Sequence, residues 1–123
     1  MPTTETALPS TLETSYIVVW EYQVKPECEA EFVAAYGPEG DWARLFRRSP
    51  EFRGVELLGS AGNVGRFFTL DHWSSSAAMD LFLSTNATAY DVLDRRLSVL
   101  TVWERRIGGF SCDTQAEFNA KFG

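Results

Sequence analysis

The chain has 123 residues, yet it contains only one histidine, His72, and two cysteines, Cys28 and Cys112, that stand far apart. A structural zinc site needs four such ligands close together, so this class of site is almost excluded. A Ser–His–Asp or Cys–His catalytic arrangement would depend on His72 alone. Widely separated cysteines favour a reduced, cytosolic protein, and a single long-range disulfide is the alternative.

Basic residues are also few, since 11 Lys and Arg stand against 17 Asp and Glu, a net charge of −6. A phosphate backbone needs a basic surface, so we expect no nucleic-acid partner. No apolar run approaches the roughly 18 residues that cross a membrane. Residues 1–15 lack the basic start and apolar stretch of a signal peptide, and their Thr, Ser and Pro content predicts a flexible arm.

Hydrophobic residues make up 45% of the chain and aromatic residues 14%, which is enough for a real core. Period-two and helical spacings alternate in the order β-α-β-β-α-β, which predicts an α+β, ferredoxin-like plait with a four-stranded antiparallel sheet. Right-handed crossovers place the fourth strand beside the first, followed by the third and the second. The predicted domain spans 16–110 and leaves 111–123 as a tail. Its strands are expected at 16–24, 54–60, 66–73 and 98–107, and its helices after Pro26 and over 75–96.

Two helices cover only one face of such a sheet, yet the strands carry apolar residues on both faces. Ile17 and Val19 stand opposite Val18 and Trp20 on the first strand, for example. An exposed apolar sheet face of this size is an interface or an aggregation hazard. We therefore expect a homodimer whose two sheets face each other and enclose a cavity. The alternative is an ordinary core beneath a long loop.

Two stretches resemble the antibiotic biosynthesis monooxygenase family of the dimeric α+β barrel superfamily. They are "VVWEYQVKPECEAEF" (18–32) and "FFTLDHWSSSAAMDLF" (67–82). The resemblance implies a cofactor-free enzyme that binds a small polycyclic aromatic molecule and lets its deprotonated form react with O₂. Trp73 matches a pocket tryptophan of the family. Thr69 stands where some relatives have Asn, and Met79 where some have Tyr.

Alternation along the third strand places Thr69, Asp71 and Trp73 on one face and His72 on the other. The set that includes His72 is the more continuously apolar, so we expect it to pack under the helices. His72 is then a wall residue more than a catalytic base, although one local irregularity would reverse the faces. The side chains of Asp71 and Trp73 would then point into the cavity on the helix-free side.

Asp71 is the first candidate for a catalytic base, because a carboxylate in an aromatic cavity has a raised pKa. The alternative is an ion pair with an arginine at the rim. Glu21 is a second candidate on the first strand. If the ends of the two strands match, Val18 lies opposite Asp71 and Glu21 lies roughly 10 Å away, at ~3.3 Å per residue. That distance disfavours a shared-proton pair.

Aromatic residues offer walls for a ligand. Trp73, Trp103 and Phe67 would line the cavity or would fill the core of the dimer. Thr69 and Tyr90 would donate hydrogen bonds to a ligand oxygen, and Tyr90 would equally serve in helix packing. With these residues in place, the resemblance implies a cofactor-independent monooxygenase without a metal. The rival is a dimeric barrel that binds an apolar ligand or acts as a polyketide cyclase. Haem degradation is disfavoured because the second helix lacks the histidine of haem-degrading relatives.

Overall fold

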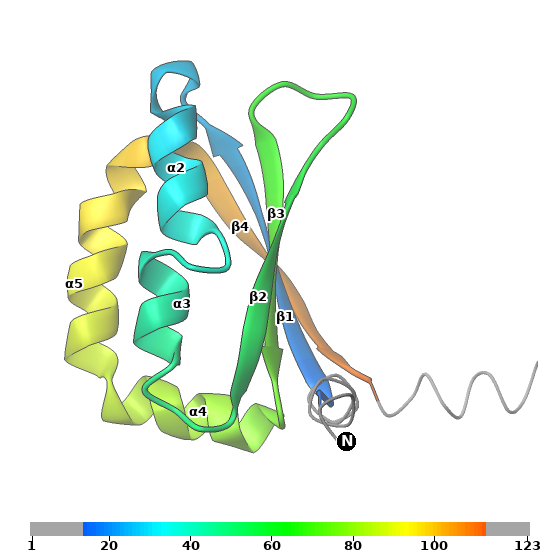
Figure 1. Ribbon diagram of the computed structural model, residues 1–123, viewed down its shortest axis with the longest axis vertical. Coiled ribbons are helices and arrows are strands. Elements are labelled where there is room, and N and C mark those ends of the chain that lie inside the picture. Colours follow the sequence, from blue (N-terminus) through cyan, green and yellow to red (C-terminus); the bar gives the residue numbers. More distant parts are fainter. Residues whose placement is uncertain (1–13, 113–123) are drawn as a thin grey trace, which may run out of the picture.

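The computed structural model describes residues 14–112, which form a four-stranded sheet with its helices on one face (Figure 1). The strands lie in the order β2-β3-β1-β4, and every neighbouring pair is antiparallel. This confirms the predicted fold class and strand order. The predicted arm and tail lie outside the described residues, apart from the positions next to the domain. The strands are β1 (Tyr16–Val24), β2 (Phe52–Gly59), β3 (Arg66–Trp73) and β4 (Thr101–Ser111).

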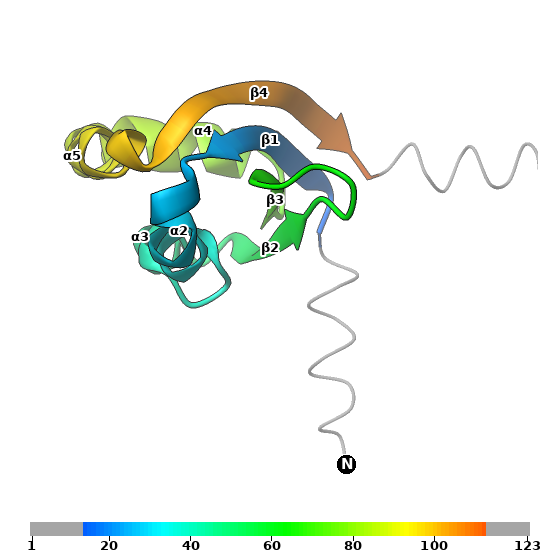
Figure 2. The same ribbon diagram turned by 90° about the horizontal axis from the view of Figure 1, so that it is seen from above.

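All helices gather on the same side of the curved sheet, as the view from above shows (Figure 2). Ser75 caps the first turn of the helix after β3, because its hydroxyl oxygen accepts from the Ala78 N–H at 3.0 Å. The helices are α2 (Glu29–Tyr36), α3 (Asp41–Phe46), α4 (Ser76–Thr85) and α5 (Ala87–Leu97), with short 3₁₀ turns at Pro26–Cys28 and Ser98–Leu100.

The single long helix expected over 75–96 is wrong, since Asn86 divides it into α4 and α5. The Asn86 side-chain amide donates to the Phe82 carbonyl at 3.1 Å and competes with the helical backbone. The fourth strand also differs from the prediction, because Ser98–Leu100 forms a 3₁₀ turn and β4 starts at Thr101.

An aromatic core fills the layer between the sheet and the helices. Phe32 and Tyr36 stack at 4.1 Å between ring centroids, one helical turn apart. Trp73 from β3 packs edge-on against Phe46 at 5.5 Å. The Phe32 ring also lies 5.2 Å from the Tyr22 ring of β1, so aromatic contacts tie both α2 and α3 to the sheet. The largest members of the core are Tyr22, Phe32, Tyr36, Trp42, Phe46, Phe67, Trp73 and Phe82.

The opposite, helix-free face of the sheet is apolar as well, but it is only half-buried. Leu58 is 48% exposed, Trp103 is 38% exposed and Phe110 is 50% exposed. The strand register places these side chains on one surface, which we call the helix-free face. Its apolar members are Ile17, Val19, Leu58, Phe68, Leu70, Trp103 and Phe110.

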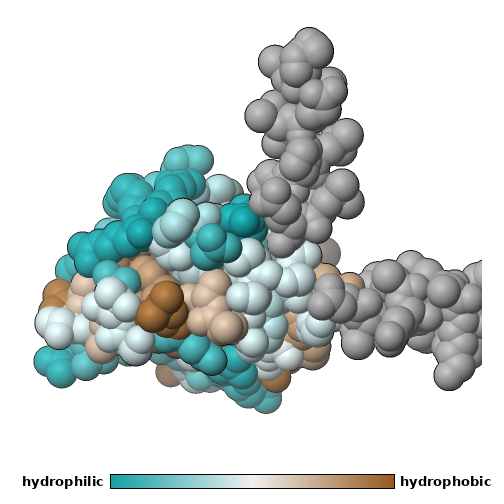
Figure 3. Space-filling model, turned by 90° about the horizontal axis from the view of Figure 1, so that it is seen from below, coloured by the Kyte–Doolittle hydropathy of each residue, from teal (hydrophilic) through white to brown (hydrophobic). Residues whose placement is uncertain are grey.

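A second apolar area lies at the end of the molecule where α4 runs. Seen from below, hydrophobic side chains gather in the middle of this end, with hydrophilic ones around them (Figure 3). Leu81 of α4 is 67% exposed, and Val92 of α5 is 60% exposed. Exposed apolar residues therefore occur both on the helix-free face and at the α4 end of the domain.

Candidate active site

The third strand turns Thr69, Asp71 and Trp73 toward the helices, which is the reverse of the predicted orientation. Thr69, Asp71 and Trp73 are 3%, 8% and 1% exposed, and the Trp73 ring lies 5.4 Å from the Phe82 ring of α4. His72 lies on the helix-free face instead. The prediction failed because both faces are apolar, so hydrophobicity alone could not select the side that the helices cover.

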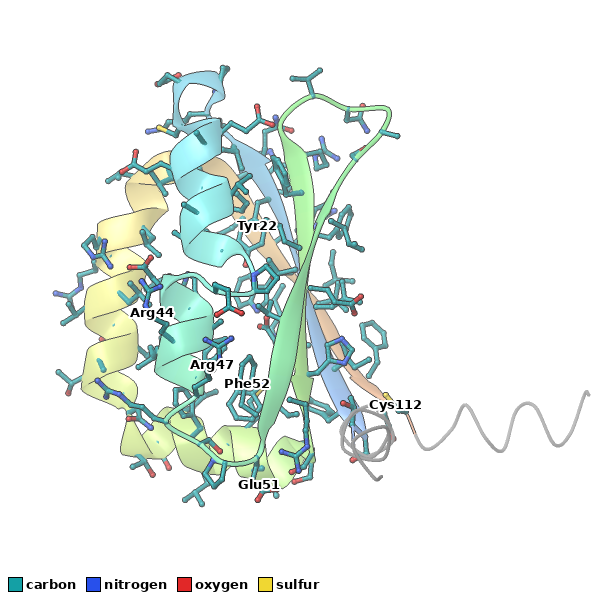
Figure 4. The ribbon with its side chains drawn as sticks, viewed as in Figure 1. Tyr22, Arg44, Arg47, Glu51, Phe52 and Cys112 are labelled. Carbon is teal, nitrogen blue, oxygen red and sulfur yellow. The ribbon has the colours of Figure 1, made fainter. Side chains whose placement is uncertain are left out.

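Asp71 lines a hollow between the sheet and the helices. Its floor comes from all four strands, β1 to β4, and its roof comes from α2, α3 and α5. Tyr22, on β1, reaches from the sheet into this layer (Figure 4). The lining residues are Trp20, Tyr22, Tyr36, Trp42, Phe46, Val55, Thr69, Asp71, Tyr90, Asp94 and Glu104.

The hollow is narrow. With the side chains as they stand, its cavity volume is about 30 Å³, which is room for about two water molecules. A second hollow of about 70 Å³ adjoins it and is lined by Trp73, Met79 and Arg106 among others. Asp71 and Tyr90 line both. A ligand larger than a few water molecules therefore requires the lining side chains to move. A ligand that occupies both hollows would lie beside Asp71.

Within residues 14–112, no hydrogen bond or ion pair joins the Asp71 carboxyl to another side chain. The predicted alternative, an ion pair with a rim arginine, is therefore absent from this part of the chain. Burial raises the pKa of Asp71 to about 7, because the charged form has lost its water without gaining a partner. A carboxyl group with such a pKa exchanges protons readily at neutral pH.

Hydroxyl groups stand near this carboxyl. The Tyr22 hydroxyl lies 3.2 Å from the Thr69 Oγ1, so one of the two donates to the other. Burial raises the pKa of Tyr22 well above its ordinary value, and it raises the pKa of Tyr90 to about 12. Both phenols therefore keep their protons at neutral pH and can donate hydrogen bonds to an oxygen anion.

Two further carboxyl groups line the same hollow, and neither was predicted from the sequence as a site residue. Glu104 lies opposite Tyr22 in the sheet register, so it faces the helices. Asp94 comes from α5. Burial, with a smaller contribution from Asp94, raises the pKa of Glu104. The alternation of β4 against Tyr22 was the signal that could have placed Glu104 here.

The model of the family described as "Antibiotic biosynthesis monooxygenase" matches residues 15–89, which hold the first three strands and eight of the eleven residues that line the hollow. The chain belongs to this family. Comparison with functionally curated proteins finds no match.

Solved structures with the same fold include members of the antibiotic biosynthesis monooxygenase family. A mutant of SnoaB, a cofactor-independent oxygenase from Streptomyces nogalater, is 20% identical with a TM-score of 0.65, over 79% of this chain and 91% of SnoaB. A conserved protein from Methanosarcina mazei Go1 is 16% identical with a TM-score of 0.60, over 85% and 96% of the two chains. A further antibiotic biosynthesis monooxygenase is 17% identical with a TM-score of 0.54, over 75% and 93%. These likenesses establish the fold.

The monooxygenase-family domain brings Asp71, Thr69 and Tyr90 to the hollow and Trp73 to its neighbour. Phe67 does not line either one, because its ring packs in the core 5.2 Å from Phe32. The sequence grouped Thr69, Asp71 and Trp73 on one face of β3, as the structure has them, but it placed that face on the helix-free side of the sheet.

Glu21 lies on the helix-free face, away from the hollow. Its carboxylate accepts from Arg105 at 2.5 Å and from Arg66 at 3.0 Å, and the Arg105 hydrogen bond holds its pKa below the ordinary value. A carboxylate held by two arginines is a poor base. The Trp103 ring lies under the same two guanidinium groups, at 5.0 Å from Arg66 and 5.7 Å from Arg105. Neither Glu21 nor Trp103 can therefore act in the hollow.

His72 is also on the helix-free face, where its Nε2 lies 2.7 Å from the Glu56 carboxylate. The predicted position under the helices is wrong, and the imidazole cannot reach the hollow from the far side of the sheet. Cys112 lies beyond the end of β4, remote from the helices (Figure 4). Residues 14–112 contain no group of His, Cys, Asp and Glu side chains that could hold a metal ion, and none of their helices is long and apolar enough to span a membrane.

Proposed function

We propose that this protein is a cofactor-independent monooxygenase that acts on a small aromatic molecule with O₂. The observation that carries the proposal is the unpaired, buried Asp71 carboxyl in an aromatic hollow, with a pKa of about 7. Such a group is suited to removing a proton from a phenol or from a carbon next to a carbonyl. Membership of the monooxygenase family and the likeness in fold to SnoaB support the same reaction class.

In the proposed reaction, Asp71 takes a proton from a ring CH₂ group of the substrate. The resulting carbanion, drawn as an enolate, adds to O₂ and forms a peroxide anion, which takes the proton back from Asp71. Loss of water then leaves a carbonyl group, so one oxygen atom of O₂ enters the product and the other leaves as water. Hydrogen bonds from Thr69, Tyr22 and Tyr90 would favour the enolate oxygen.

The aromatic walls would supply orientation and exclude water. Trp42 of α3 and Tyr90 of α5 lie 4.9 Å apart between ring centroids and form part of the roof. Because the cavity holds only about two waters as it stands, a ligand would enter by displacing side chains of this roof. A site that closes around its substrate keeps the carbanion away from solvent protons.

We also propose a homodimer that forms through the helix-free face. Seven apolar side chains on that face are exposed or half-buried, which is the pattern of an interface lacking its partner. The dimer would stabilise the sheet, but the hollow lies within a single chain. The predicted chamber between two sheets is therefore not the site that we propose.

Oxygen uptake with an anthrone, a three-ring compound with a reactive CH₂ group, tests the reaction. We expect uptake and formation of the quinone, and about a 10²–10⁴-fold loss of rate in Asp71→Asn. Glu21→Gln is the matched control, since its carboxylate lies on the other face of the sheet, and it should keep the rate. Equal loss of the anthrone under nitrogen would instead indicate a cyclase-like or simple binding protein. Undiminished oxidation by Asp71→Asn would exclude Asp71 as the base.

A further inference from the structure

The hollow at Asp71 is both acidic and aromatic. Three carboxyl groups line it, from Asp71, Asp94 and Glu104. Among the described residues, no Lys, Arg or His contributes to its walls. The remaining walls include the rings of Trp20, Tyr22, Tyr36, Trp42, Phe46 and Tyr90.

These carboxyl groups form no ion pair within the part of the chain that the structure describes. Other acidic residues, such as Glu21 and Asp41, each pair with two arginines. Asp71 is more than nine-tenths buried and unpartnered, and it lines the hollow. Glu104 and Asp94 are only half-buried, whereas Asp71 is buried beside them. A desolvated carboxylate next to two other carboxyl groups is costly unless a cation or a proton compensates it.

We infer that the substrate carries a protonated amine, which binds between Glu104 and Asp94 with its aromatic part against the rings of the hollow. This inference deepens the proposed function and rests on it, because the bound molecule is a substrate only if the protein is the proposed enzyme. Ammonium groups are attracted both by carboxylates and by the faces of Trp and Tyr rings. The walls of this hollow offer both kinds of group.

The charges also orient the ligand. Arg106 lines the adjoining hollow, together with Asp71 and Trp73, so that side repels an ammonium group. Glu104 and Asp94 line only the first hollow. The amine therefore lies at the Glu104 end, and the carbon that loses its proton lies beside Asp71. Deprotonation then yields a zwitterion, which an acidic site tolerates far better than a bare anion.

Binding measured under nitrogen tests the inference independently of turnover. Three probes share an indole ring and differ in charge: tryptamine, 3-propylindole and indole-3-propionate. Titration calorimetry at pH 7.5 and low salt should show tryptamine binding at least about tenfold more tightly than the neutral probe, with the anion weakest. Glu104→Gln and Asp94→Asn should each abolish most of this preference without weakening 3-propylindole. Asp80→Asn, an exposed carboxylate on α4, is the matched control and should change nothing.

Equal affinity for the three probes, or no binding of tryptamine up to its solubility limit, would overturn the inference. A tryptamine preference that survives both Glu104→Gln and Asp94→Asn would overturn it too. The two proposals fail separately. An ammonium preference without oxygen uptake by any amine-bearing anthrone would refute the oxygenase alone, whereas rapid oxidation of a neutral anthrone without any preference would refute the ammonium site alone.

Discussion

Glu21 and Asp71 are both at least nine-tenths buried in the same sheet, yet their side chains point to opposite faces of it. Val18 is the register partner of Asp71, and Glu21 follows three positions later on β1. An odd offset along a strand reverses the face. Glu21 therefore meets two arginines, and Asp71 meets none among residues 14–112. The two pKa values move in opposite directions, which leads to opposite predictions.

Asp71→Asn should stabilise the protein at alkaline pH. The folded pKa of about 7 exceeds the ordinary 3.8, so between these values the folded state binds the extra proton. The contribution of Asp71 to the free energy of unfolding is therefore fully present below pH 4 and is lost as the pH rises through about 7, a change on the order of 4 kcal/mol. Asp71→Asn cannot ionise at this position, so its free energy of unfolding does not fall over this pH range. Urea unfolding at pH 4 and pH 8 should show a gain for Asp71→Asn at pH 8 only.

Asp80→Asn removes an exposed carboxylate from α4 and should leave the free energy of unfolding unchanged at both pH values. A drop in stability of Asp71→Asn at pH 8 would mean that the charged carboxylate has a stabilising partner.

Glu21→Gln should destabilise the protein at neutral pH, in contrast to Asp71→Asn. The folded pKa of Glu21 is lowered, chiefly by its hydrogen bond to Arg105. Its contribution is therefore present above the ordinary pKa of 4.5 and is lost as the pH falls through the folded value. Thermal unfolding should show a lower Tm for Glu21→Gln at pH 7, and the difference should shrink below pH 4. A constant difference across this range would exclude the ionic network as its cause.

Trp73→Ala should cost about 3–5 kcal/mol of stability, since the ring is 1% exposed and packs on three other aromatic rings. Trp103→Ala removes the same side chain from the helix-free face, where it is 38% exposed. We expect about 1 kcal/mol or less from that change in dilute, monomeric protein. Denaturant unfolding of both variants at low protein concentration compares the two sites, and equal losses would contradict the burial difference.

Phe110→Glu should weaken self-association. Phe110 is 50% exposed on the helix-free face, where a second sheet would desolvate the new carboxylate. Val92→Glu places the same charge at a 60% exposed position on α5 and serves as the control. Sedimentation velocity should find a dimer for the parent and for Val92→Glu, and monomer for Phe110→Glu. A monomeric parent protein would remove the basis of the proposed dimer.

Much of the fold could be predicted because its signals are local. The strands Tyr16–Val24 and Arg66–Trp73 have the predicted bounds, since β-branched and aromatic runs specify strands directly. The break at Asn86 escaped prediction, because a single polar residue within an amphipathic pattern is compatible with an unbroken helix.

The sequence by itself determined the order of the elements, their pairing and the alternation that groups Thr69 with Asp71 and Trp73. Only the tertiary structure decided which face of the sheet the helices cover, and therefore that Asp71 is desolvated while Glu21 receives arginines. The physical reason is that both faces are apolar. Local patterns state which side chains share a face, whereas the side that becomes buried depends on the packing of α2 to α5 against the whole sheet.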